Sequence, residues 1–288
     1  MTDATARESV LFADAMLARR LERAEATMNA ACVDARAALQ PSSGAGWIDV
    51  DGTYAMFDTV GSPLTQTFGL GLFGEVTDGA MLTLERFFGS RGSDVLHEVS
   101  PLADPSAVGQ LNSRGYRPIE FTTVLIRPLG GAWPIPGAQR DGLRVRRSAV
   151  EEADLWSETS ARGWSETAEL SAFMLDFGQV IARRPDALSF IVESEGRAIA
   201  AGALSTTGGV ALLAGASTVP EGRKQGAQSA LLESRLRFAA EQGCDLAMMC
   251  ALPGSASQRN AERQGFRVAY TRIKWHRSVL ALASLSSS

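Results

Sequence analysis

The chain of 288 residues is 45% hydrophobic and 21% charged, a composition typical of a globular protein, and its length fits two domains better than one. A net charge of −4 argues against nucleic-acid binding, because neutralising phosphates requires a concentrated basic surface. Three cysteines without C-x-x-C spacing and only two histidines argue against a zinc or other metal site.

The N-terminal region, residues 4–39, is predicted to be one long helix, with apolar residues three and four positions apart and Pro41 beyond its end. Charged residues every few positions exclude a signal peptide, and no apolar run anywhere reaches about 18 residues. We therefore expect a cytoplasmic protein that does not enter a membrane. The apolar stripe of this helix suits core packing or a dimer contact, so a monomer and a homodimer both stay open.

Two strand regions follow, Trp47–Val60 and Leu64–Phe73, separated by glycine- and proline-containing turns. The second contains Gly69-Leu-Gly71-Leu-Phe-Gly74, a G-x-G-x-x-G run. A dinucleotide site needs a strongly buried strand before such a run and a helix that opens at its third glycine. The stretch before Gly69 is a weak buried strand, so an NAD-binding function is only an alternative.

An internal repeat explains the first half better. Residues 94–127 and residues 245–277 share the order strand, proline-containing loop, short helix, Gly-aromatic-Arg and strand. Upstream of the repeat the first half is shorter by about eight residues. The repeat indicates that the first half has lost one loop and that the Gly69 to Gly74 run lies on the strand before it. The other interpretation is accidental similarity between two unrelated α/β segments.

The segment Pro128–Gly142 is rich in glycine and proline and has no periodicity, which predicts a linker. We expect a first domain at residues 1–130, a linker at 131–142 and a second domain at 143–288. The second half is predicted to contain a strand at 143–148, helices at 151–161 and 169–184, and strands at 188–193, 197–205 and 210–218. Ser148 and Glu151 form a predicted capping box for the first of these helices.

A strand, a basic turn and an amphipathic helix follow each other in residues 210–243. The turn contains Arg223-Lys224-Gln225-Gly226-Ala227-Gln228. The first turn of a helix has backbone N–H groups without internal partners and a partial positive charge, and Gly226 allows close approach to the backbone. The turn is therefore a candidate phosphate or pyrophosphate site, to which Arg223 and Lys224 add full charges.

Arg223-x-x-Gly226-x-Gln228 after such a strand resembles motif A of the GNAT superfamily of acetyl-CoA-dependent acyltransferases, although the family has glycine or alanine where this chain has Gln228. Residues 253–266 resemble the second cofactor element of the family, a loop and short helix that end in Gly265-Phe266. The resemblance covers residues 143–278. With the repeat it implies an α/β (α+β) fold of two tandem GNAT-like domains, the first degenerate, with mixed, mostly antiparallel sheets flanked by helices.

The resemblance implies acetyl-CoA as cosubstrate and a set of residues that bind it. The strand before motif A would offer backbone groups to the pantetheine arm, the amides of residues 224–229 would hold the pyrophosphate, and two residues of the next helix would touch the cofactor. The expected cofactor-binding residues are Ser217, Thr218, Val219, Arg223, Lys224, Gln225, Gly226, Ala227, Gln228, Ser229, Ser257 and Asn260. Ser257 and Asn260 could instead only cap or pack their helix.

The catalytic residues are less clear. Many relatives use a tyrosine as the acid, four residues before the glycine that corresponds to Gly265, and that position is Ala261 here. Glu193 and Tyr270 are weak substitutes, and we expect burial to make Cys250 inert. Aromatic and acidic residues of the two helices that usually form the acceptor wall would suit a cationic amine, or would be an ordinary helix surface; they are Trp156, Glu158, Trp164, Glu166 and Asp176.

The sequence thus predicts an N-acetyltransferase that transfers an acetyl group from acetyl-CoA to a small-molecule amine, without a metal. The alternative is a non-catalytic acyl-CoA-binding or interaction module, which is suggested by Ala261 and by the degenerate first half.

Overall fold

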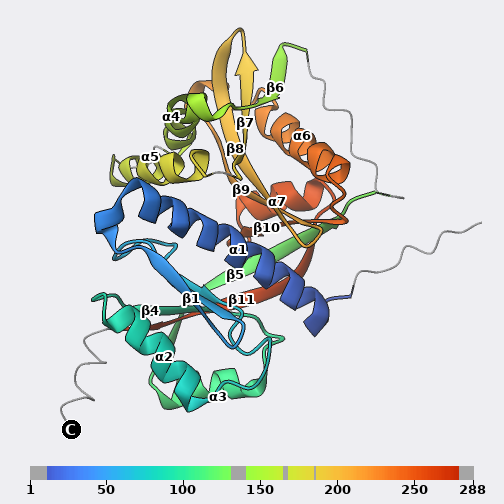
Figure 1. The fold of residues 1–288 in the computed structure, drawn as a ribbon. Helices are drawn as coiled ribbons and strands as arrows, with labels where there is room; N and C mark the ends of the chain where they lie inside the picture. The colour runs from blue at the N-terminus through green and yellow to red at the C-terminus, as the bar shows by residue number, and fades with distance from the viewer. Residues whose placement is uncertain (1–11, 131–140, 165–167, 185, 279–288) are drawn as a thin grey trace, which may run out of the picture.

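A computed structural model describes residues 12–130, 141–164, 168–184 and 186–278. They form one sheet in the strand order β1-β2-β3-β4-β11-β5-β10-β9-β8-β7-β6, with helices on both faces (Figure 1). The first half contributes α1 (Ala15–Leu39), η1 (Pro41–Ser43), β1 (Gly46–Val50), β2 (Thr53–Phe57), β3 (Gln66–Phe68), α2 (Asp78–Gly89), β4 (Val95–Val99), α3 (Pro105–Ser113) and β5 (Arg117–Pro128). The second half contributes β6 (Leu143–Arg147), η2 (Val150–Glu152), α4 (Ala153–Gly163), α5 (Ala168–Ala182), β7 (Leu188–Ser194), β8 (Arg197–Thr207), β9 (Val210–Thr218), η3 (Pro220–Gly222), α6 (Ala227–Glu241), β10 (Leu246–Ala251), α7 (Ala256–Arg263) and β11 (Arg267–Arg277).

The long helix α1 lies across both halves of the molecule (Figure 1). It begins where the Asp14 side chain accepts a hydrogen bond from the Leu17 amide at 2.8 Å, an ordinary N-cap. Its buried stripe, which includes Leu21 and Ala24, packs on the sheet, and the helix contacts β1 to β3 of the first half and β8 and β9 of the second. The predicted start of this helix, before residue 12, lies outside the described residues.

The two halves exchange their last strands. β5 of the first half lies between β11 and β10, and β11 of the second half lies between β4 and β5. The sequence predicts a separate sheet for each half, but these exchanged strands join the two halves in one continuous sheet. The predicted domain limits remain predictions, because hydrogen-bonded strands cross from one half to the other.

Alternation along β10 separates two cores. Ala247 points to the face covered by α6, whereas Leu246 and Met248 point to the face covered by α1. The face covered by α2 and α3 has its own core around Leu84, Phe88 and other residues of the first half. Strands β9 and β10, in the middle of the sheet, therefore contribute residues to the cores on both of its faces.

The predicted repeat has the same element order in the structure: β4, α3 and β5 in the first half correspond to β10, α7 and β11 in the second. One detail is wrong. The Gly69 to Gly74 run does not lie on a strand, because β3 ends at Phe68 and Gly69 and Gly71 have positive φ values of 88° and 74°. The run is the connection from β3 to α2, so the first half has a different loop there rather than none.

The predicted capping box is also displaced. The carboxylate of Glu152, not of Glu151, accepts the Ala149 amide at 2.9 Å, and Arg146 donates two hydrogen bonds to it. A short 3-10 turn at Val150–Glu152 precedes α4 and shifts the capping residue by one position.

Candidate active site

A cleft opens where β9 and β10 separate. The two parallel strands pair from Leu246↔Val210 to Met248↔Leu212 and no further, although β9 continues to Thr218. On its other edge β9 stays paired with β8, with a register shift between the pairs of Ala201 and Ala203. The unpaired edge of β9 therefore faces an opening in the middle of the sheet.

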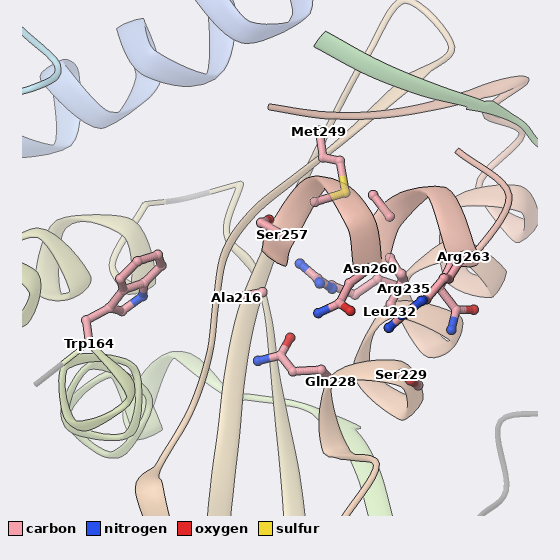
Figure 2. A pocket seen from close by; sticks show the side chains of 12 residues that line it. Trp164, Ala216, Gln228, Ser229, Leu232, Arg235, Met249, Ser257, Asn260 and Arg263 are labelled. Carbon is pink, nitrogen blue, oxygen red and sulfur yellow. The ribbon is translucent and has the colours of Figure 1, made fainter. Parts of the chain in front are cut away.

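A cavity of about 470 Å³ occupies this opening, within the size range of small-molecule sites (Figure 2). Its wall comes from α6, α7, β9, β10 and the end of α4. The lining residues are Trp164, Ala216, Gln228, Ser229, Leu232, Arg235, Met249, Ser257, Asn260, Ala261, Arg263 and Gln264.

The turn before α6 presents free backbone donors beside this cavity, whose lining includes Gln228 and Ser229. None of the amides from Lys224 to Ser229 meets an acceptor in the part of the chain that the structure describes, whereas the Ala230 amide bonds to the Gly226 carbonyl. Lys224 (φ 63°) and Gly226 (φ 82°) both have left-handed backbone, which turns the chain into the helix. Consecutive free amides at a helix N-terminus have the geometry and the partial positive charge that suit an anion.

Arg223 and Lys224, the predicted charge partners of that anion, are exposed beside these amides. Arg223 makes one long contact, 3.5 Å from Nη2 to the Gly163 carbonyl, and neither residue forms an ion pair with a carboxylate in the ranges that the structure describes. Arg162 of α4, not Arg223, pairs with Glu221 of the same turn. Both predicted cations are therefore available to a ligand.

Gln228 has a specific contact where the family motif has a small residue. Its Nε2 donates to the Thr218 hydroxyl at 2.7 Å, so the side chain bridges from α6 to the end of β9 inside the cavity wall. A glycine or alanine could not make this bridge. The departure from the motif is therefore a structural feature of this cleft.

The predicted residues of β9 are close to the cleft, but some of their groups are already bonded. The Ser217 hydroxyl donates to the Ser160 carbonyl of α4 at 2.9 Å, and the Val219 amide donates to the Ile199 carbonyl at 3.0 Å. Thr218 accepts from Gln228, as described above. The Val219 amide and the Ser217 hydroxyl would have to exchange these partners before they could bind a ligand.

Ser257 and Asn260 of α7 both line the cavity (Figure 2). Neither caps its helix, because the N-cap is Ser255, whose hydroxyl accepts the Gln258 amide at 3.2 Å. Ala261, on the same helix, lines the cavity and is 1% exposed. The position at which relatives have a tyrosine thus belongs to the cavity wall, and it has no acid here.

The two weak catalytic candidates do not line the cavity. Glu193 lies on β7 and accepts from Arg146 at 2.8 Å, near the edge of the sheet. Tyr270 lies on β11, on the face covered by α1, and its hydroxyl donates to Glu22 at 2.9 Å. Burial is the largest of the causes that raise the pKa of Tyr270 well above its ordinary value, which disfavours a phenolate there.

That same face contains a buried charged cluster, which we define as Glu22, Glu25, Glu98 and Arg272. Arg272 lies 3.3 Å from Glu22, 2.8 Å from Glu25 and 3.4 Å from Glu98. Burial raises the pKa of Glu22 to about 7 despite the nearby guanidinium. Cys250, in contact with Glu25 and Arg272, has its pKa raised well above the usual thiol value, mainly by burial, so the predicted inertness of this thiol agrees with its surroundings.

The predicted acceptor-wall residues divide into three groups. Trp156 is fully buried and its Nε1 donates to the Phe190 carbonyl, so it is a core residue, and Asp176 is occupied by Arg36. Glu158 is exposed on α4, and Glu166 lies outside the described residues. Among the described members of the set, only Trp164 lines the cavity, with 38% of its surface exposed.

Sequence reasoning missed Arg235. This residue of α6 is 3% exposed, lines the cavity, and donates to the Ala203 and Ala214 carbonyls at 2.9 and 3.3 Å. A signal was present in the sequence, because Arg235 interrupts an otherwise apolar helix stripe beside Leu231, Leu232 and Leu236.

The equivalent loop of the first half is closed. The Gly71 carbonyl accepts the Asp104 amide at 2.7 Å, the Leu72 carbonyl accepts Arg19, and the Val76 amide bonds to Ser106. The helix that follows begins four residues after Gly74 and has an acidic first turn. These contacts attach the loop to α1 and α3, and no helix opens at its third glycine, which argues against the NAD-binding alternative.

Among the described residues, no group of histidine, cysteine, aspartate or glutamate side chains could hold a metal ion. None of the helices in those ranges combines the length and the apolar character needed to cross a membrane.

Comparison with known proteins agrees with this geometry. Residues 150–266 match the model of the acetyltransferase (GNAT) family, and no curated protein matches the chain. A GCN5-related N-acetyltransferase from Kribbella flavida has a similar structure, with a TM-score of 0.59 at 17% identity over 85% of this chain and 95% of that one.

Two other solved structures are similar. The GCN5-related N-acetyltransferase from Sphaerobacter thermophilus gives a TM-score of 0.54 at 16% identity, over 89% of this chain and 92% of that one. A tandem GNAT protein from the clavulanic acid biosynthesis pathway gives a TM-score of 0.56 at 14% identity, over 79% of this chain and 78% of that one. The predicted fold class is confirmed.

Proposed function

The chain carries a domain of the acetyltransferase (GNAT) family, and on this premise we propose that the cleft between β9 and β10 transfers the acetyl group of acetyl-CoA to the amine of a small molecule. The family assigns the chain to the acyltransferases, with acetyl-CoA as cosubstrate. The acceptor class and the residues of the site are the proposed part.

The observation that carries the proposal is the run of free amides from Lys224 to Ser229, which ends at the cavity wall with Gln228 and Ser229. Unbonded backbone N–H groups at a helix N-terminus fit a pyrophosphate, and Arg223 and Lys224 stand beside them. Ser257 and Asn260 would hold the coenzyme from the α7 side. The residues present therefore fit acetyl-CoA.

When bound, acetyl-CoA would supply a thioester, whose carbonyl carbon is the electrophile that the amine nitrogen attacks. The amine must first lose a proton, and the lining of the described cavity contains no carboxylate, histidine, tyrosine or cysteine that could take it. We infer that water takes this proton. The chain contributes by holding both substrates in line at the strand opening, which is the positioning part of catalysis.

Trp164 supports an amine acceptor of small size. It lines the end of the cavity formed by α4, across β9 from the α6 side (Figure 2). An indole face attracts a cationic group by about 0.5–2 kcal/mol, depending on its exposure to water. An ammonium-bearing small molecule is the ligand chemistry that this end of the cavity suits.

Calorimetric titration with acetyl-CoA tests the cofactor site. The wild-type chain should bind, and the double variant R223A/K224A should bind at least about tenfold more weakly, since a tenfold change corresponds to about 1.4 kcal/mol. Arg86→Ala, which removes an exposed cation from α2, is the matched control and should leave the affinity unchanged. Absence of binding to the wild type, or equal affinities for the double variant and the wild type, would contradict the proposal.

The described lining of the cavity contains no carboxylate, histidine, tyrosine or cysteine, which favours the second candidate, a non-catalytic acyl-CoA-binding module. A panel of small amines, assayed by release of free coenzyme A thiol, distinguishes the two. Turnover with any acceptor removes the second candidate. Binding of acetyl-CoA without thiol release from any amine would favour it.

A further inference from the structure

Arg235 is a buried cation for which the structure provides no negative partner. Its side chain is 3% exposed, and no carboxylate of the described residues forms an ion pair with it. Its hydrogen bonds go only to carbonyl oxygens, those of Leu231, Ala203 and Ala214. Burial lowers the pKa of Arg235 to about 10, and no neighbouring charge offsets this effect.

An unpaired buried charge is costly, so its presence needs a reason. A charge that is buried without an opposite charge destabilises the folded chain, because it has lost its hydration and no other charge compensates it. The fold even makes room for this charge. A side chain at Gly202 would place its Cβ 3.0 Å from Arg235 Nη1, so the glycine leaves the space that the guanidinium fills.

The position of Arg235 in the cavity indicates which ligand group could balance it. The free amides that suit phosphates lie at the start of α6, and the helix rise of about 1.5 Å per residue puts Arg235 about 9 Å further along than Ser229. Arg235 lies at the strand opening, bonded to Ala214 and lining the same cavity as Ala216 and Met249 (Figure 2). A coenzyme whose phosphates were held by those amides would extend along the cavity, with its sulfur toward Arg235.

We propose that Arg235 is the charge partner of the coenzyme sulfur and stabilises the thiolate that leaves during acyl transfer. The inference rests on the proposed function. In the reaction a C–N bond forms, the C–S bond breaks, and the electron pair of that bond stays on sulfur. The amine protons go to water, and Arg235 keeps its own. The guanidinium thus takes the place of the acid that is absent at Ala261, by compensating charge instead of giving a proton.

The thiol of bound coenzyme A gives a direct test that does not depend on an acceptor or on turnover. Thiolate formation is followed by ultraviolet absorbance as a function of pH, with protein plus desulfo-coenzyme A as the baseline. The chain's own thiols at Cys32, Cys244 and Cys250 all have their pKa raised, mainly by burial, and the baseline removes any remaining contribution. An ordinary thiol titrates near 8.5, and an opposite charge within about 4–6 Å lowers that midpoint by about 1–3 pH units.

Two variants separate charge from packing. Arg235→Lys keeps the positive charge and should keep a lowered midpoint for bound coenzyme. Arg235→Gln keeps a hydrogen-bond donor for the strand carbonyls but has no charge, so its midpoint should return to that of free coenzyme A. Arg259→Gln removes an exposed cation of α7 that does not line the cavity, so it is the matched control and should leave the midpoint at the wild-type value.

The outcomes are distinct. A wild-type midpoint equal to that of free coenzyme A overturns the inference, and so does an unchanged midpoint in folded Arg235→Gln. If Arg235→Gln fails to fold, the midpoints of the wild type and of Arg235→Lys still test the inference, because both should lie below that of free coenzyme A. Failure of the wild-type chain to bind coenzyme A at all contradicts the proposed function itself and is seen first, in the calorimetric titration.

Discussion

Glu22 should make the stability of this protein fall as the pH rises from 5 to 8. The carboxyl is 1% exposed between Tyr270 and Arg272, with the further carboxylates of Glu25 and Glu98 close by. Burial is the main reason that its pKa is raised from 4.5 to about 7, and the two acidic neighbours add to the effect while Arg272 opposes it.

The sign follows from proton linkage. The unfolded chain gives up the Glu22 proton near pH 4.5, whereas the folded chain keeps it to about pH 7. Stabilisation by the protonated carboxyl is therefore fully present below pH 4.5 and is lost as the pH rises through 7. At 1.36 kcal/mol for each pH unit between the two values, the loss is about 3 kcal/mol.

Urea unfolding of the wild type and of Glu22→Gln at several pH values between 5 and 8 measures this loss. Glutamine mimics the neutral acid and cannot titrate, so the stability of the variant relative to the wild type should increase by about 2–3 kcal/mol across this range. Using the difference between the two proteins cancels other titrating groups. Glu22→Leu should show the same pH trend but lower stability throughout, because it also loses the bonds to Tyr270 and Arg272. A difference that stays constant with pH, or that changes in the opposite direction, would refute the reasoning.

Three other predictions concern packing and the cleft. Gly163→Ala should lower stability by about 1–3 kcal/mol in thermal unfolding, because its Cβ would lie 2.4 Å from a side chain of β9; wild-type stability would contradict this. Arg36→Met should cost about 3–5 kcal/mol in urea unfolding, since it leaves Asp58, 1% exposed, without its ion pair; a loss below about 1 kcal/mol would exclude this role. Gln228→Ala should leave the fold intact and raise coenzyme A affinity about two- to tenfold in calorimetry, because a net hydrogen bond of about 0.5–1.5 kcal/mol to Thr218 no longer competes with the ligand; weaker binding would show that Gln228 is itself a ligand contact.

The local elements of the second half were predictable from sequence, because periodicity and turn residues act over a few positions. The strand at 210–218 is β9 as predicted, and the helix after Gly226 begins with the free amides expected of the motif. The sequence was less informative where one glycine changes the local backbone. Gly69 ends β3 early, and so the glycine run that looked like part of a strand is a loop.

The candidate site was predicted in part. Gln228, Ser229, Ser257 and Asn260 were expected to bind the cofactor, and all four line one cavity, although their role in binding stays a prediction. The contact of Gln228 with Thr218 and the burial of Arg235 could not be predicted, because both depend on how α6 is rotated against the strands. Rotation of a helix is set by the packing of its neighbours, not by its own pattern.

The sequence by itself determined the order of the elements, the internal repeat and the half of the chain that holds the turn proposed to bind an anion. Only the tertiary structure decided that β5 and β11 change places, since two strands that are equivalent in a repeat carry the same alternation and local pattern cannot tell one partner edge from the other. Only the tertiary structure likewise placed α1, whose Glu22 accepts a hydrogen bond from Tyr270, 248 positions away in the sequence. Contacts over such separations depend on burial that exists only once both halves have folded together.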